Sequence, residues 1–170
     1  MTETRASLPP FQALLDEHAQ AVHAFLRGMV GPDDAEDCLQ ETFLAALRAY
    51  PRAEPANLRA WIFTIARRKA IDHHRAATAR PVPVADPGEL APAEASDAPP
   101  IDGRGSALWS AVAGLPPKQR AAVVLRFAVD MRYREIADAM GTTEEAARRN
   151  VHEALRKLRA SAHELKEAMR

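Results

Sequence analysis

Hydrophobic residues recur every three or four positions through residues 8–80 and again through residues 106–165. This spacing places apolar side chains on one face of an α-helix. Three helices are predicted in the first stretch, over residues 9–30, 31–50 and 58–75. Gly31-Pro32 and Pro51 interrupt the pattern between them, and Asn57 is predicted to cap the third helix.

The same spacing predicts a further set of helices in the second stretch, over residues 107–115, 118–130, 133–141 and 142–169. Thr142 and Glu145 match a capping box at the start of the last helix. A short helix, a turn containing Gly141 and a longer helix form the helix-turn-helix pattern. One stripe of the last helix is predicted to be buried, namely Ala147, Val151, Ala154 and Leu158.

A proline-rich segment over residues 81–105 separates the two stretches and holds six of the thirteen prolines. Proline lacks an amide donor and fixes φ, so we expect an extended linker here. Hydrophobic residues are 47% of the chain and aromatic residues only 5%, which favours helices packed on helices. The predicted fold is all-α, with two small helical domains over 8–80 and 106–165.

The formal net charge is zero, but charges of one sign are grouped along the chain. Residues 33–41 and 81–102 carry acids without bases, whereas residues 58–80 carry six bases and one acid. This alternation predicts several different partners rather than one uniform nucleic-acid surface. The lone Cys38 excludes an intramolecular disulfide and is interpreted as a buried thiol. No apolar run is long enough for a membrane span, so we expect a cytoplasmic protein without membrane insertion.

Together the two halves resemble an extracytoplasmic-function (ECF, group IV) RNA polymerase sigma factor. AEDCLQETFLAAL at 35–47 and LRAWIFTIARRKAIDHHR at 58–75 resemble the family's region 2, which binds polymerase and opens the −10 element. LPPKQRAAVVLRF at 115–127 and YREIADAMGTTEEAARRNVHEALRKLR at 133–159 resemble region 4, which reads the −35 element. The resemblance implies core polymerase and promoter DNA as partners, with an anti-sigma factor as a further candidate.

The resemblance also implies roles for individual residues. The polymerase contacts would be Asp37, Gln40, Glu41, Phe43 and Leu44. The −10 contacts would be Arg52, Asn57, Phe63, Thr64, Arg67, Arg68, Asp72 and Arg75. The −35 contacts would be Thr143, Glu145, Arg148, Arg149, His152 and Arg156.

Arginine and aspartate suit these roles chemically. Arginine grips phosphates and guanine edges and stacks on unpaired bases, and aspartate accepts hydrogen bonds from base amino groups. Five residues depart from the family pattern and leave the promoter sequence open, namely Arg68, Glu145, Asn150, Glu153 and Leu155. Of these, Glu153 is expected to weaken −35 binding.

The linker is long enough for both elements to be read at once. Elements two helical turns apart on one face of DNA lie roughly 70 Å apart. The segment 81–105 reaches nearly 80 Å at about 3.1 Å per residue in polyproline-like form.

Other functions are weaker readings of the sequence. His73 and His74 point about 100° apart on a helix and do not suit one metal ion, so no metal and no cofactor is expected. No catalytic motif appears, and an enzyme using residues 67–75 is the weakest alternative. The main alternative is a helix-turn-helix regulator whose N-terminal half senses a signal or dimerises. Such a half would not need the basic stretch at 58–80.

Overall fold

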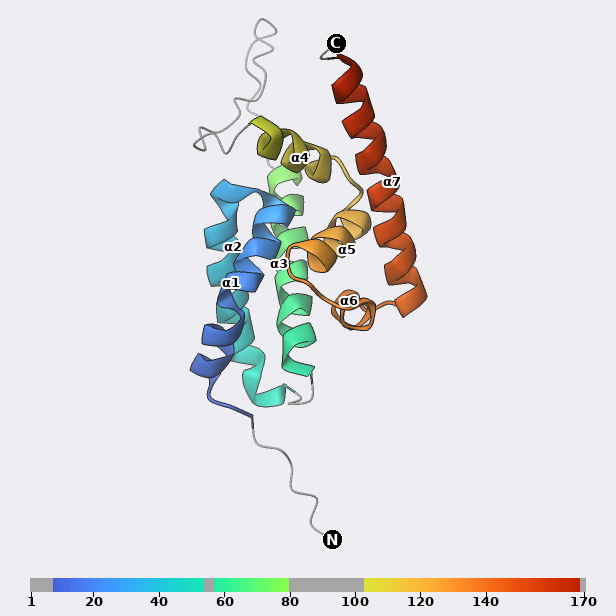
Figure 1. Ribbon diagram of the computed structural model, residues 1–170. Coiled ribbons are helices and arrows are strands. Elements are labelled where there is room, and N and C mark those ends of the chain that lie inside the picture. Colours follow the sequence, from blue (N-terminus) through green and yellow to red (C-terminus); the bar gives the residue numbers. More distant parts are fainter. Residues whose placement is uncertain (1–7, 54–56, 80–102, 169–170) are drawn as a thin grey trace, which may run out of the picture.

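The computed structural model describes residues 8–53, 57–79 and 103–168, and every regular element in these ranges is a helix (Figure 1). The N-terminal half contains α1 (Phe11–Val30), α2 (Pro32–Ala49), the 3-10 turn η1 (Tyr50–Arg52) and α3 (Leu58–Ala79). The C-terminal half contains α4 (Gly103–Ala113), α5 (Pro117–Phe127), α6 (Tyr133–Met140) and α7 (Glu144–Ala168). The all-α prediction is confirmed.

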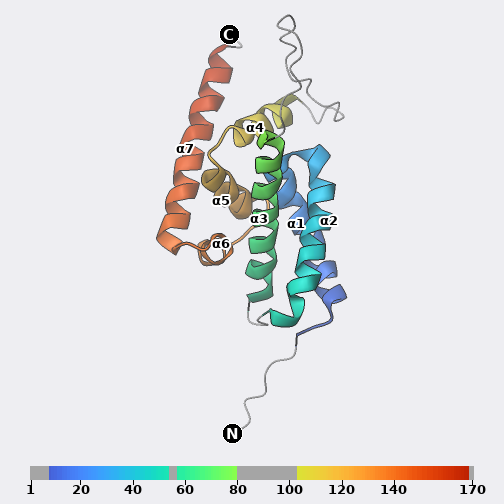
Figure 2. The same cartoon turned by 180° about the vertical axis from the view of Figure 1, so that it is seen from behind.

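The N-terminal half is a bundle in which α1, α2 and α3 each pack against the other two (Figure 2). Pro32 stands in the first turn of α2, where a helix needs no amide donor, and Asp33 and Asp34 beside it favour the helix dipole. Phe25 of α1 and Phe63 of α3 meet edge to face at 5.7 Å in the centre of this bundle. The bundle therefore holds α3 by one buried face.

In the C-terminal half, α5 and α6 pack against the long helix α7. Asp130 has φ +55° and turns the chain between α5 and α6, so α5 ends at Phe127 although its predicted end was residue 130. Gly141 adopts the left-handed conformation (φ +62°) and closes α6 as predicted. The predicted stripe of α7 is buried at Ala147, Val151 and Ala154.

Further predicted boundaries differ from the structure, and α3 extends to Ala79 beyond its predicted end at residue 75. Thr143, not Thr142, caps α7, because its hydroxyl accepts a hydrogen bond from the Ala146 amide at 3.2 Å. Thr142 instead donates its amide to Ala137 in the turn that ends α6. Helix α4 begins at Gly103, inside the segment predicted as linker, and it packs against α1 and α7. Residues 81–102 of that predicted linker lie outside the described residues.

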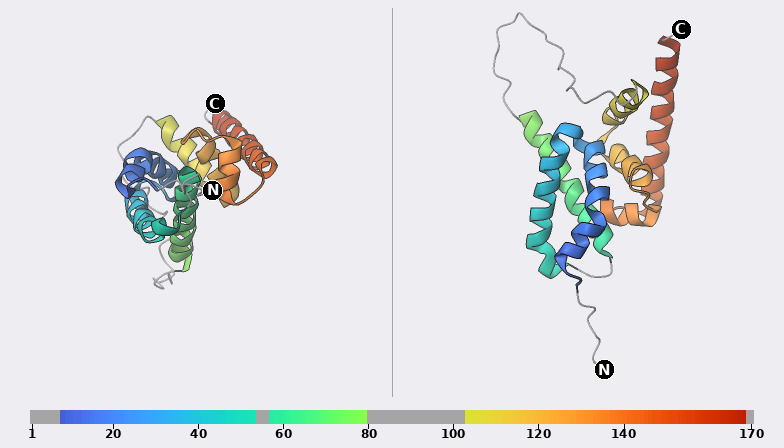
Figure 3. Two further views of the ribbon diagram at one scale, coloured as in Figure 1. Left: turned by 90° about the horizontal axis from the view of Figure 1, so that it is seen from below. Right: turned by 60° about the vertical axis from the view of Figure 1, so that its left-hand side comes forward.

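The two halves lie directly against one another. Helix α3 packs on α6, and α1 packs on α5. Seen from below, α1, α2 and α3 occupy one side of the molecule and α5, α6 and α7 the other (Figure 3). This arrangement decides which side chains of α3 remain accessible.

Candidate nucleic-acid and polymerase interface

The outer face of α2 is polar with apolar side chains among the charges. The predicted polymerase contacts Asp37, Gln40 and Glu41 are exposed, and Leu44 is 54% exposed. Phe43 is partly buried against the core. The Lys69 ammonium of α3 lies 3.6 Å from the Glu41 carboxylate. A surface of this kind suits binding to another protein.

Helix α3 is apolar on one face and basic on the other. Asn57 caps it as predicted, because its side-chain oxygen accepts the Ala60 amide at 3.2 Å. Its inner residues Ile62, Phe63 and Ala66 are fully buried. The predicted −10 residues Arg68, Asp72 and Arg75 are exposed, and Arg52 is exposed on η1.

Phe63 does not belong with these −10 residues. It is fully buried and its ring packs against Phe25, so the prediction that Phe63 contacts DNA is wrong. Residues four apart share a helix face, and Phe63 lies one residue before Thr64, about 100° away from the exposed stripe. The aromatic side chain beside the stripe is instead Trp61, which is partly exposed and lies 6.0 Å from Tyr50.

The first turns of α7 carry most of the predicted −35 residues. Glu145, Arg149, His152 and Arg156 are exposed. Arg148 is held in place, because its guanidinium bonds Glu144 at 2.5 Å and lies 4.7 Å from the centre of the Tyr133 ring.

Two of the departures from the family pattern are turned inward on α7. Glu153 accepts a hydrogen bond from Gln119 of α5 at 2.7 Å. Asn150 donates to the Ala146 carbonyl at 2.9 Å. The Glu153 carboxylate and the Asn150 amide nitrogen therefore form hydrogen bonds within the protein.

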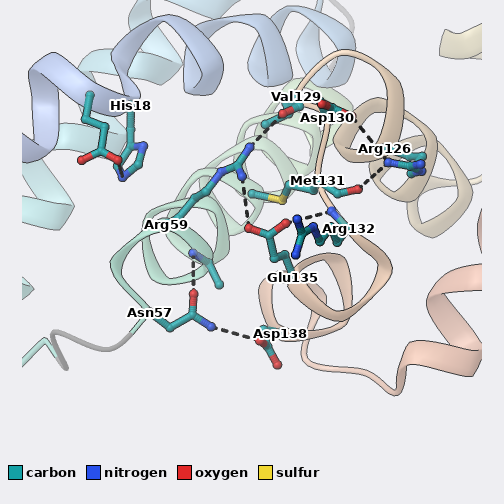
Figure 4. Close-up of polar contacts among 12 residues, drawn as sticks. His18, Asn57, Arg59, Arg126, Val129, Asp130, Met131, Arg132, Glu135 and Asp138 are labelled. Carbon is teal, nitrogen blue, oxygen red and sulfur yellow. Dashed lines mark hydrogen bonds and ion pairs between the residues drawn. The ribbon is translucent and has the colours of Figure 1, made fainter.

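Polar side chains of α3 and α6 join the two halves (Figure 4). The Arg59 guanidinium donates to Glu135 at 3.1 Å and to the Val129 carbonyl at 2.9 Å. Asn57 donates to the Asp138 carboxylate at 3.0 Å. Sequence reasoning missed Arg59, Glu135 and Asp138, because no local pattern links residues this far apart in the chain.

The predicted −10 residue Thr64 also takes part in this contact. Its hydroxyl lies 2.9 Å from the Ala60 carbonyl of its own helix and 3.3 Å from the Ala139 carbonyl of α6. With Asn57, two of the predicted −10 residues therefore contact the C-terminal half.

An apolar contact joins the halves where α1 crosses α5. A Cβ atom added at Gly28 would lie 2.8 Å from both methyl carbons of Val124 and 3.4 Å from the Trp109 ring. Only glycine allows α1 and α5 to approach this closely. Nearby, Arg120 of α5 donates to the Met29 carbonyl at the end of α1 at 3.0 Å and also to Ala113.

Three cations surround a crevice of about 470 Å³ between α3, α5, α6 and α7, namely Arg67 of α3, Lys118 of α5 and Arg149 of α7. Thr142 and Asn150 also line it, and the residues that line it include no acid. Burial, with a smaller effect from the neighbouring Arg68, lowers the pKa of Arg67. Arg67, a predicted −10 residue, and Arg149, a predicted −35 residue, thus line the same crevice.

No helix in the part of the chain that the structure describes is both long and apolar enough to cross a membrane.

Family models match both halves of the chain. Residues 14–80 match Sigma-70 region 2, and residues 106–158 match Sigma-70, region 4. The RNA polymerase sigma factor CarQ of Myxococcus xanthus is 36% identical over 162 residues, which are 91% of this chain and 90% of CarQ. The ECF RNA polymerase sigma factor ShbA of Streptomyces griseus is 34% identical over 145 residues, which cover 78% of this chain and 76% of ShbA. SigE of Mycolicibacterium smegmatis is 30% identical, and the match covers 93% of this chain but only 63% of SigE.

Solved structures agree with these matches. CnrH, in complex with the cytosolic domain of CnrY, has a TM-score of 0.66 and 26% identity, over 88% of this chain and 85% of CnrH. The sigma factor RpoE of Bartonella quintana has a TM-score of 0.68 over 90% of this chain and 96% of RpoE; at 24% identity it supports the fold. The chain therefore belongs to the ECF RNA polymerase sigma factors, the transcription factors that join core polymerase and direct transcription initiation.

Proposed function

We propose that the exposed polar stripe of α3 reads and helps to open the −10 element. The observation that supports this most is the division of the helix into two faces. Ile62 and Ala66 are fully buried, whereas Arg68 and Asp72 are exposed on the opposite face. An arginine beside an aspartate on a rigid helix suits unpaired bases and their phosphates. Unstacking a base costs a few kcal/mol, which polymerase binding would help to supply.

The remaining roles follow from the other exposed faces. The face of α2 with Asp37, Gln40, Glu41 and Leu44 would bind core polymerase, while Phe43 supports it from the core. The start of α7 would enter the major groove at the −35 element, with Arg149 and His152 as readers and Arg156 on a phosphate. Because Arg148 is bonded to Glu144 and Tyr133, it would position the helix start rather than read a base.

Two further proposals concern the setting of this protein. Because it would direct transcription initiation on chromosomal DNA, we propose that the protein is located in the cytoplasm. CnrH was solved with the cytosolic domain of CnrY bound, so we also propose that a protein partner restrains this chain.

The first test is reconstitution with purified bacterial core polymerase and fragmented DNA from the protein's own genome. We expect sequenced transcripts to begin at discrete sites that share two upstream motifs. Transcripts with no shared motifs, together with protection of duplex DNA by the protein alone, would favour the helix-turn-helix regulator.

On a promoter found in this way, Arg68→Ala tests the role of α3. We expect loss of promoter opening, measured by permanganate reactivity of unpaired thymines, with polymerase binding retained in a native gel. Arg27→Ala removes another exposed arginine, from α1, and should open the promoter normally. Normal opening by the Arg68→Ala variant would refute the assignment.

A further inference from the structure

The crevice where α3, α5, α6 and α7 come together collects positive charge from three separate helices (Figure 2). Arg67 comes from α3, Lys118 from the first turn of α5 and Arg149 from α7. Within the part of the chain that the structure describes, none of these three side chains forms an ion pair with a carboxylate. The residues that line the crevice therefore supply positive charge without any acid to balance it.

Arg67 is the cation of the three that water reaches least. Its side chain is half-buried, whereas Lys118 and Arg149 are exposed. Burial, and to a smaller extent the neighbouring Arg68, lowers the pKa of Arg67, so both effects disfavour its charged form. An anion bound in the crevice would offset both effects, because a nearby opposite charge favours the charged form.

Residues from the first turns of two helices line this crevice. Lys118 lies in the first turn of α5 and Ala146 in the first turn of α7. The first turn of a helix carries partial positive charge, so a lysine there is unfavourable unless a negative group lies nearby. The two acids in the first turn of α7, Glu144 and Glu145, are exposed and are not among the residues that line the crevice.

We propose that this crevice binds a small anion with two or more linked phosphate groups, either a free oligophosphate or the phosphate chain of a nucleotide. Its volume of about 470 Å³ falls within the range of roughly 300–1,000 Å³ that small-molecule sites occupy. A phosphate monoester carries about −1.5 to −2 charges at pH 7, so three cations match two linked phosphates better than one. The planar guanidinium of arginine suits two phosphate oxygens at once, and lysine adds a point charge.

This site is distinct from the proposed contacts with promoter DNA. Arg67 is a predicted −10 residue and Arg149 a predicted −35 residue, and the two elements lie roughly 70 Å apart on the promoter. DNA would therefore contact these arginines separately. In the structure they line one crevice, so a single small anion can contact both of them together with Lys118.

Isothermal titration calorimetry on the full chain, without DNA or polymerase, tests the site with two probes, inorganic pyrophosphate and ATP. Magnesium is left out of the buffer because it binds phosphate oxygens itself. We expect Arg67→Gln and Lys118→Gln each to weaken pyrophosphate binding by about ten-fold or more, because each removes a charge-assisted hydrogen bond. Pyrophosphate binding at least as tight as that of ATP supports a free oligophosphate as the ligand, and tighter binding of ATP supports a nucleotide.

A change of shape without a change of charge tests whether the anion enters the crevice. Ala146 is partly buried and lines it, so Ala146→Leu reduces the space available to a ligand. We expect this variant also to bind pyrophosphate about ten-fold more weakly. Ala160→Leu is the matched control at an exposed position of the same helix, and it should bind as the wild type does.

Arg27→Gln and Lys157→Gln are the matched controls for charge, because they remove exposed cations that do not line the crevice. Both should keep wild-type affinity for pyrophosphate. Equal weakening in these controls would show that the anion follows only the net charge, which would overturn the proposal. Undiminished binding in Arg67→Gln and Lys118→Gln, or in Ala146→Leu, with normal helical circular dichroism would overturn it as well. If neither probe binds the wild type, the proposal is wrong.

Discussion

Cys38 lies in the core of the N-terminal bundle, where its thiol is 2% exposed. Burial and then the Glu41 carboxylate raise its pKa to about 11, against an opposing effect of Lys69 and with a smaller contribution from Asp34. Only the thiolate reacts with disulfide reagents and alkylating agents. We therefore expect Cys38 to react with Ellman's reagent at pH 8 at least about a hundred-fold more slowly in the folded protein than in guanidinium chloride. Equal rates in the two states would show that the bundle opens readily around α2.

His18 is a second buried titratable group, 7% exposed on α1. Burial lowers its pKa from the usual 6.5, Glu17 opposes this effect, and Arg59 adds to it. The unfolded chain therefore binds a proton more readily than the folded one. The contribution of His18 to stability is present above pH 6.5 and is lost as the pH falls towards its folded pKa.

Urea unfolding at pH 7.5 and at pH 5 checks this expectation. The free energy of unfolding should fall towards pH 5, and part of that fall should disappear in a His18→Gln variant. A fall of the same size in the variant would show that other groups cause it.

At the scale of the elements, the turn between α6 and α7 depends on Gly141. Its φ of +62° disfavours any residue with a Cβ, although a Cβ atom there would meet nothing within 4 Å. We expect Gly141→Ala to lower the free energy of unfolding by about 1 kcal/mol, because only backbone strain opposes it. Gly114→Ala is the matched control in a turn without positive φ, where thermal unfolding should change less.

Helix α3 combines two chemical faces that its sequence shows only in part. The family resemblance implied that Phe63 contacts DNA, but tertiary packing against Phe25 buries that ring. The exposed residues Arg68, Asp72 and Arg75 follow helical spacing, so the sequence alone places them on one stripe. Which part of that stripe α6 would cover depended on the arrangement of the two halves.

At the scale of the whole molecule, a covalent link should convert the contact between the two halves into a permanent one. Asn57 and Asp138 contact each other across the halves, so cysteines at these two positions are within reach of a short bis-maleimide. We expect the linked protein to lose transcription initiation with core polymerase. The same variant without the reagent should retain more activity. Full activity of the linked protein would show that the halves need not separate.

The sequence by itself determined the helical elements, the Asn57 cap, the Gly141 turn and the family. Helical periodicity, the Asn57 cap and the left-handed Gly141 act over a few neighbouring residues, so their signals are local. Tertiary structure alone decided which faces meet. Arg59 and Glu135 are 76 residues apart and Asn57 and Asp138 are 81 apart, and the close approach of α1 to α5 depends on Gly28 facing Val124. No local pattern encodes such pairs, because their contact arises only when two separately formed surfaces match in shape and charge.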